Sequence, residues 1–306
     1  MRKNHKPEDD NRRYCIYFVL LLGIFLLPIQ SATSQTLLKP FVLASLSNVI
    51  SESSFKENVD IVRHKLALAD FFIAGDFQPY SDAHIFVITN DQIIELASRT
   101  EQGGYFSALR VTLTQVDNEI QLSYSNPDYL FHAYRLEGGS GKFSQTLKRV
   151  LGFLEYYGAE KGMPKEKLRN YHYMFGMEYF DEPTMLGEFE THHHALSVLE
   201  NGLSQEKAGV AKVYRIDMPN QNKSLFGVTM TRDCSSDEFL MQGVDFKPVR
   251  STPHLPYELL VSENKIFTLH PHFRIAMNFP DLQMTKFMKM MCIPGDIIDA
   301  LEDVVS

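Results

Sequence analysis

Apolar side chains recur at helical spacing in two separate stretches of the chain. They are Phe55, Val59, Val62 and Leu66 in the first stretch, and Leu196, Leu199 and Leu203 in the second. Side chains three or four positions apart share one face of a helix. The pattern therefore predicts one amphipathic helix in each half of the chain.

A period-two alternation predicts two β-hairpins. Leu109, Val111 and Leu113 alternate with polar residues as far as a turn at Asp117-Asn118, and residues 120–124 alternate on the way back. Residues 257–261 and 265–269 flank Glu263-Asn264 in the same way. Alternation of this kind is typical of antiparallel pairs with one buried and one wet face, which indicates an α+β fold.

Comparison of the chain with itself suggests two copies of one unit. Residues 120–129 align without a gap to residues 273–282, each interpreted as a strand that runs into a helix start at Pro-Asp, and residues 85–89 resemble residues 225–229. Matching order of elements at long spacing is the signature of a repeat. We expect two tandem α+β repeats, each an antiparallel or mixed sheet with helices on one face, arranged as an internal pseudo-dimer.

The expected boundaries are residues 35–137 for the first repeat, 138–185 for a helical connector and 186–306 for the second repeat. In the connector, Phe143, Leu147 and Leu151 belong to a helical stripe that extends to Leu154, and Gly158 is the expected end of that helix. A second short helix is expected to begin near Pro164.

The first 34 residues have the organisation of a secretory signal peptide. Arg12 and Arg13 precede an apolar run from Tyr14 to Ile29, and small residues around Ala32 and Ser34 provide a cleavage site. The alternative is an uncleaved membrane anchor, because the run is only a little shorter than the roughly 20 residues that span a bilayer. Both interpretations place the remaining chain outside the cytoplasm, in the periplasm or the extracellular space.

Composition narrows the classes of partner. The chain is 44% hydrophobic, which is typical of a globular protein, and its formal net charge is −8. An acidic surface repels phosphate backbones, so we expect no nucleic-acid partner. Contact with a membrane is expected only through the N-terminal segment, if it is retained.

Two of the three cysteines lie outside the expected signal peptide. Cys15 lies inside the expected signal, and Cys234 and Cys292 remain. In an oxidising compartment these two can form a disulfide, but buried thiols and a metal, haem or redox role are open alternatives.

Several short segments resemble a known bacterial family. They are Thr100–Tyr105, Leu109–Val111, Ser123–Pro127, Ala133–Arg135, Tyr171–Met177, Lys212–Ile216, and Phe287-Met288 with Met291-Cys292. The chain resembles exported members of the family catalogued as domain of unknown function 302. The resemblance implies a small α+β unit that dimerises, here within one chain, and it implies no established activity or catalytic residue.

Two groups of residues are candidates for binding. Around the first hairpin, Tyr105, Arg110, Tyr124, Tyr134 and Arg135 could line a cleft for an anionic or apolar small molecule. In the second half, the candidate metal ligands are His254, His270, His272, Met288, Met291 and Cys292. Imidazole with thioether and thiolate ligands suits copper or a haem axial pair.

The sequence contains no recognisable catalytic constellation. We therefore expect an exported, non-catalytic protein that binds a small molecule or a protein partner in a groove between the repeats. The first alternative is a periplasmic metal or redox protein that uses the Cys, Met and His residues of the second half. The second alternative is an enzyme whose catalytic residues are distant in sequence.

Overall fold

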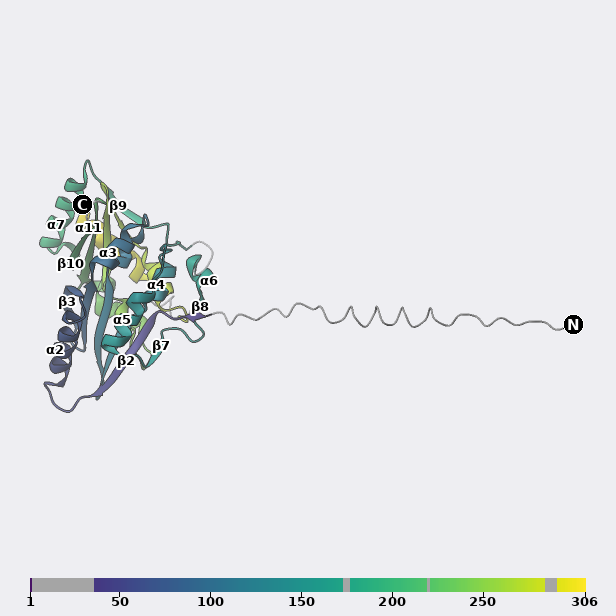
Figure 1. Ribbon diagram of the computed structural model, residues 1–306. Helices are drawn as coiled ribbons and strands as arrows, with labels where there is room; N and C mark the ends of the chain where they lie inside the picture. Colours follow the sequence, from purple (N-terminus) through teal and green to yellow (C-terminus); the bar gives the residue numbers. More distant parts are fainter. Residues whose placement is uncertain (2–35, 173–176, 219–220, 284–290) are drawn as a thin grey trace. The chain divides into compact units, whose positions relative to one another are not determined.

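Two antiparallel sheets form the centre of the computed structural model, which describes residues 36–172, 177–218, 221–283 and 291–306 together with Met1 (Figure 1). Thr36–Ser306 forms one compact unit. The expected signal peptide at 1–34 lies outside the described residues apart from Met1. Within the described part, no helix is long and apolar enough to cross a membrane.

The first sheet has the strand order β3-β4-β5-β6-β2-β7 among the described residues. Its strands are β2 (Phe41–Asn48), β3 (Phe72–Tyr80), β4 (Ala83–Thr89), β5 (Leu109–Val116), β6 (Glu119–Ser125) and β7 (Glu155–Tyr157). Val116 pairs with Glu119, so Asp117-Asn118 is a two-residue turn and the first predicted hairpin is confirmed. A further small pair joins β1 (Leu37–Leu38) to β8 (Met163–Pro164).

The second sheet has the order β10-β11-β12-β13-β9 in the same described set. Its strands are β9 (Thr184–Glu188), β10 (Val210–Met218), β11 (Lys223–Met230), β12 (Tyr257–Ser262) and β13 (Lys265–Thr268). Ser262 pairs with Lys265, which confirms the second predicted hairpin. All pairings in both sheets are antiparallel, and with the helices they make the fold α+β, as expected.

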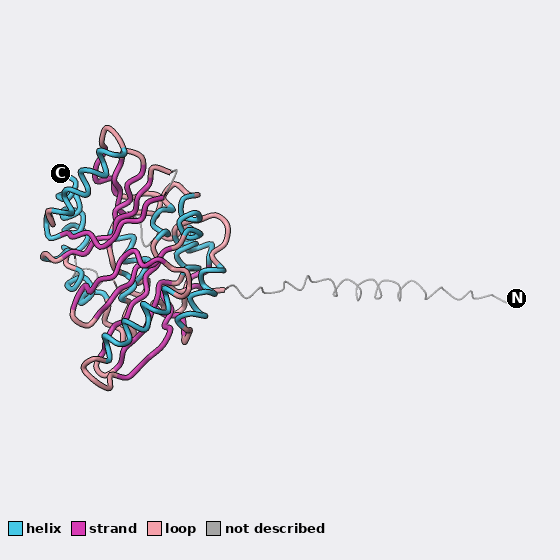
Figure 2. The backbone as a smooth tube through the Cα atoms, turned by 60° about the vertical axis from the view of Figure 1, so that its left-hand side comes forward, coloured by secondary structure: helices cyan, strands magenta, loops and turns pink. Residues whose placement is uncertain are grey.

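Helices lie on the outside of the sheets (Figure 2). The first half of the chain and the connector contribute α2 (Ser54–Ala67), α3 (Asp91–Ser98), α4 (Pro127–Ala133), α5 (Gly141–Leu151) and α6 (Lys165–Arg169). The second half contributes α7 (His192–Ser204), α8 (Asp237–Val244), α9 (Pro271–Asn278) and α11 (Cys292–Val305). Four 3-10 turns complete the described elements: η1 (Gly103–Ser107), η2 (Lys207–Gly209), η3 (Asp233–Ser235) and η4 (Thr252–His254). The two predicted amphipathic helices correspond to α2 and α7, and each buries its apolar face.

Local capping explains where two of the helices begin. The Asn126 side chain accepts the backbone N–H of Asp128, and Pro127 is the first residue of α4. The His270 ring accepts the backbone N–H of His272, and Pro271 is the first residue of α9. Proline costs nothing at the first helical position, because the N–H that it lacks has no partner within the helix.

Three details of the sequence interpretation are wrong. Residues 273–278 form helix α9 instead of a strand, so the gapless alignment places a helix against strand β6. Helix α5 ends at Leu151, because Gly152 adopts φ +107° and stops it before Gly158. The connector also contains strands β7 and β8 and the start of β9, and β7 pairs with β2 and extends the first sheet.

The expected wet face of the first hairpin is also wrong. The polar positions Thr112, Thr114 and Gln121 are at most 4% exposed. Gln121 donates from Nε2 to the Pro248 carbonyl and accepts the N–H of Arg250, both at 2.9 Å. A segment of the second half therefore covers the face that alternation alone assigned to solvent.

The two sheets face each other. Strands β3 and β10 contact each other at their edges, and 3-10 turn η4 contacts β5 while η1 contacts β12. Arg110 of β5 and Glu258 of β12 form an ion pair, although β5 and β12 are each the third strand counted from those edges. A flat continuous sheet would keep these residues far apart, since neighbouring strands are about 4.8 Å apart.

Candidate functional site

The residues predicted to bind a ligand near the first hairpin lie in the protein interior. Tyr105, Arg110, Tyr124 and Tyr134 are at most 2% exposed, and they are not among the residues that line the described cavities. Arg135 lies apart from them and binds Asp181 at 2.5 Å. The structure gives the four buried residues a role in packing.

Arg110 belongs to a buried charge cluster between the sheets. Its guanidinium pairs with Glu258, which also accepts a hydrogen bond from the Tyr214 hydroxyl at 2.6 Å. A second guanidinium, that of Arg274, lies 4.0 Å from the same carboxylate and donates to the carbonyls of Pro256 and His254. Two cations therefore share one carboxylate in a site that excludes solvent.

Burial and the charge of Glu258 act in opposite directions on Arg110 and in the same direction on Tyr214. Burial disfavours the Arg110 cation, but the Glu258 carboxylate outweighs burial and raises the pKa of Arg110. Burial, reinforced by the charge of Glu258, raises the pKa of Tyr214 well above its ordinary value. The Arg110 guanidinium therefore stays charged near neutral pH, and the Tyr214 hydroxyl keeps its proton.

The predicted metal ligands do not form one cluster. His254 is fully buried, and its Nδ1 lies 2.8 Å from the amide of Asn278. Burial lowers the pKa of His254 well below its ordinary value, so this ring is neutral. Met291 is 70% exposed, and Met288 lies outside the described residues.

Cys234 and Cys292 form a disulfide. The sequence had left this open beside two buried thiols and a metal, haem or redox role. The Cα atoms of the two cysteines are 6.0 Å apart, and the bond joins η3 to the start of α11. A disulfide sulfur is not a thiolate ligand, so in this form Cys292 does not serve a metal.

His270 and His272 do come together, with a partner that the sequence did not suggest. Nδ1 of His270 lies 3.2 Å from Oε2 of Glu178, and Nδ1 of His272 lies 3.4 Å from the same oxygen. Glu178 is 92 positions before His270 in the sequence, so no local spacing indicated the contact.

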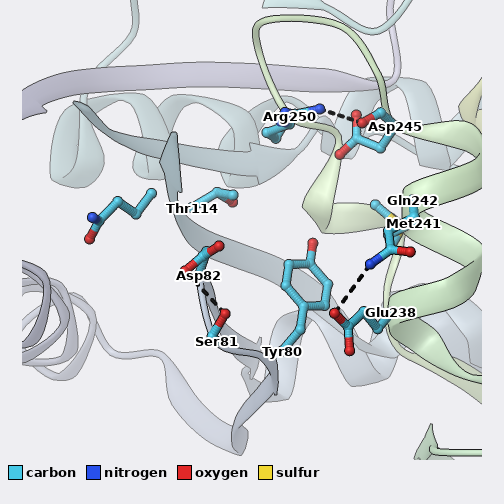
Figure 3. A pocket seen from close by; sticks show the side chains of 10 residues that line it. Tyr80, Ser81, Asp82, Thr114, Glu238, Met241, Gln242, Asp245 and Arg250 are labelled. Atoms are coloured by element: carbon cyan, nitrogen blue, oxygen red, sulfur yellow. Dashed lines mark hydrogen bonds between the residues drawn. The ribbon is translucent and has the colours of Figure 1, made fainter. Parts of the chain in front are cut away.

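A polar pocket opens between the two halves of the chain (Figure 3). One side is formed by Tyr80, Ser81 and Asp82 at the β3–β4 turn, with Thr114 and Gln115 of β5. The other side is formed by Glu238, Met241 and Gln242 of α8, with Asp245 and Arg250. The cavity volume is about 220 Å³, which admits a small molecule.

The charges that line this pocket are mainly negative. Asp82 and Glu238 are exposed, and Arg250 donates to the backbone carbonyl of Asp245 at 2.5 Å. Both carboxylate oxygens of Asp245 accept the N–H of Ser251, yet burial raises the pKa of Asp245 to about 7. With Asp245 ionised, three carboxylates oppose one guanidinium.

Sequence reasoning missed every side chain of this pocket. The residues come from a hairpin turn, a strand, a helix and a loop that span 170 positions from Tyr80 to Arg250. The sequence indicated only that a pocket could lie between the two halves. No motif marks the individual residues that line it.

Comparison of the chain with protein-family models, with curated proteins and with solved structures gave no match. The fold and the pocket define the class: an α+β protein with an acidic pocket between its two halves.

Proposed function

We propose that this protein is an exported binding protein for a small organic cation, and that it does not catalyse covalent chemistry. The observation that carries the proposal is the pocket between the halves, which is lined by the carboxyl groups of Asp82, Glu238 and Asp245 and by one guanidinium, that of Arg250. Carboxylates placed around a small cavity attract an ammonium or guanidinium group. Tyr80 adds an aromatic ring to the lining, and such rings also attract organic cations.

Export is supported by the N-terminal sequence pattern and by the disulfide. A disulfide persists in oxidising compartments outside the cytoplasm, and the Cys234–Cys292 bond is compatible with that location. We propose cleavage after Ser34, with retention as an anchor as the alternative.

We also propose that the two halves are repeats of one unit. In support, β2 lies beside β6 in the first sheet, as β9 lies beside β13 in the second. The contacts between halves are reciprocal as well, because α3 contacts β10 and α8 contacts β3. The pocket is then a groove between repeats, a usual location for a small ligand.

The test is calorimetric titration of the purified protein with small amines of graded size, namely methylammonium, guanidinium and butane-1,4-diamine. We expect one of these to bind with one site per chain. The variants Asp82→Asn and Glu238→Gln should each weaken binding at least about threefold, because each removes one exposed charge from the pocket.

Glu52→Gln is the matched control, since Glu52 is an exposed carboxylate outside the pocket. Its affinity should equal that of the parent protein. Absence of binding by the whole panel, or an equal loss of affinity in Glu52→Gln, would refute the proposed ligand class.

A further inference from the structure

We propose that Glu178, His270 and His272 form a binding site for a divalent transition metal ion, with Zn²⁺ as the reference ion. The site is separate from the acidic pocket and does not depend on the function proposed for it. Each residue offers one ligand atom, and these three atoms all lie within 4.8 Å of one another.

The spacing of the ligand atoms fits a tetrahedral ion. Ligands that bind Zn²⁺ at about 2.05 Å in tetrahedral geometry are about 3.3 Å apart. The two nitrogen-to-carboxylate distances, 3.2 Å for His270 and 3.4 Å for His272, lie on either side of that value. Both distances end on the same oxygen, so one ion can contact all three side chains with little movement.

The chemistry of the three ligands limits the class of ion. Two imidazoles and one carboxylate are borderline ligands that suit zinc and its neighbours, whereas calcium and magnesium prefer oxygen alone. Three protein ligands leave a fourth tetrahedral position for water, as in open zinc sites.

The surroundings allow an ion to enter and still exclude much of the solvent. The side chains of Glu178, His270 and His272 are 31%, 17% and 30% exposed, respectively. Oε2 of Glu178 is buried and makes no hydrogen bond within the described part of the chain, although it lies near both rings. A bound metal cation gives this oxygen a coordinating partner. Burying a carboxylate oxygen without such a partner costs free energy.

Metal binding has one local cost. Nδ1 of His270 accepts the N–H of His272 at 3.2 Å, at the long end of the range for such bonds, and an ion on that nitrogen replaces this helix cap. Charge-assisted coordination outweighs one long neutral hydrogen bond.

The experiment is titration of the EDTA-treated protein, prepared without a histidine tag, with Zn²⁺ alone. We expect one ion per chain, and visible d–d absorption of tetrahedral type when Co²⁺ replaces Zn²⁺. Glu178→Gln and His272→Gln should each lower the affinity at least tenfold, because changes outside the ligand shell already cost that much in metal sites.

His193→Gln is the matched control, since His193 is an exposed histidine in the consecutive histidines at the start of α7. It should bind Zn²⁺ like the parent protein. Melting temperatures in EDTA establish that each variant is folded, and either Glu178→Gln or His272→Gln suffices for the test. Equal affinity in the parent and in a folded Glu178→Gln or His272→Gln variant would overturn the proposal, as would loss of the ion in His193→Gln.

Discussion

Glu258 neutralises two guanidinium groups in the interior, and this makes it sensitive to substitution. Removing one partner of a buried ion pair leaves an uncompensated charge, which typically costs 3–5 kcal/mol. We expect Glu258→Gln to destabilise the protein by about 3 kcal/mol or more, because Arg110 and Arg274 both lose the carboxylate that faces them. Urea unfolding measures the loss.

The control for Glu258→Gln is an exposed ion pair of the same type. Glu95 and Arg99 interact at 2.7 Å with more than half of each side chain exposed. Glu95→Gln should change the free energy of unfolding by less than about 0.5 kcal/mol. Similar losses for the two variants would show that the interior cluster contributes little.

The raised pKa of Asp237 predicts how the free energy of unfolding depends on pH. Burial raises its pKa to about 7 from 3.8, although Thr229 and the N–H of Met230 donate to it. Between these two values the folded state binds more protons than the unfolded state, so the free energy of unfolding falls as pH rises. The stability associated with the protonated carboxyl is complete below pH 3.8 and is lost above about pH 7.

Asp237→Asn removes this titration while it keeps an oxygen that can accept both hydrogen bonds. Relative to the parent protein, we expect the variant to gain on the order of 2 kcal/mol between pH 5 and pH 8. Urea unfolding at the two pH values measures the difference. A difference that is the same at both would mean that Asp237 has an ordinary pKa.

At the scale of elements, Gly202 fixes how closely helix α7 approaches α11. A Cβ at this position would lie 1.9 Å from the backbone carbonyl oxygen of Val304. That oxygen belongs to the backbone of a packed helix and cannot rotate away. We expect Gly202→Ala to lower stability by about 2 kcal/mol or more, although alanine is the better helix former.

Gly295 is the matched control, because it lies in α11 with nothing within 4 Å of its added Cβ. Gly295→Ala should be neutral or stabilising by up to about 1 kcal/mol. Equal thermal melting of the two alanine variants would contradict the close packing at Gly202.

The disulfide joins two elements that are 58 positions apart. Closing a loop of this length stabilises a folded chain by about 4 kcal/mol in the chain-entropy model. We expect a Cys234→Ser/Cys292→Ser double variant to melt roughly 10 °C below the oxidised protein. A reductant should lower the melting temperature of the parent protein and leave that of the variant unchanged; unchanged melting of the parent would argue that the bond contributes little.

At the scale of the whole molecule, buried polar contacts join the two halves of the chain. The Tyr129 hydroxyl of α4 donates to the Met277 carbonyl of α9 at 2.7 Å, and Thr114 bonds Thr252 at 2.7 Å, in addition to the buried Arg110–Glu258 pair. Residues 36–137 alone would expose this surface and leave Arg110 without its partner.

We therefore expect the isolated 36–137 segment to show no cooperative thermal unfolding by circular dichroism. The chain from residue 36 to 306 should unfold in one transition and resist limited proteolysis as a single body. Cooperative unfolding of the isolated segment would show that the first half is a self-sufficient domain.

Local patterns in the sequence determined the elements. The apolar stripes of α2 and α7, the turns at Asp117-Asn118 and Glu263-Asn264, and the α+β class follow from interactions between near neighbours in the chain. These features depend on a period of 2 or 3.6 residues, which a single sequence displays directly.

Only the tertiary structure decided which faces are buried and which side chains meet. Arg110 interacts with a residue 148 positions away, and Glu178 lies beside histidines more than 90 positions later. The polar face of the first hairpin, which alternation assigned to water, is covered by the segment around Arg250. A period describes one element by itself, whereas burial and binding sites depend on the packing of elements against one another.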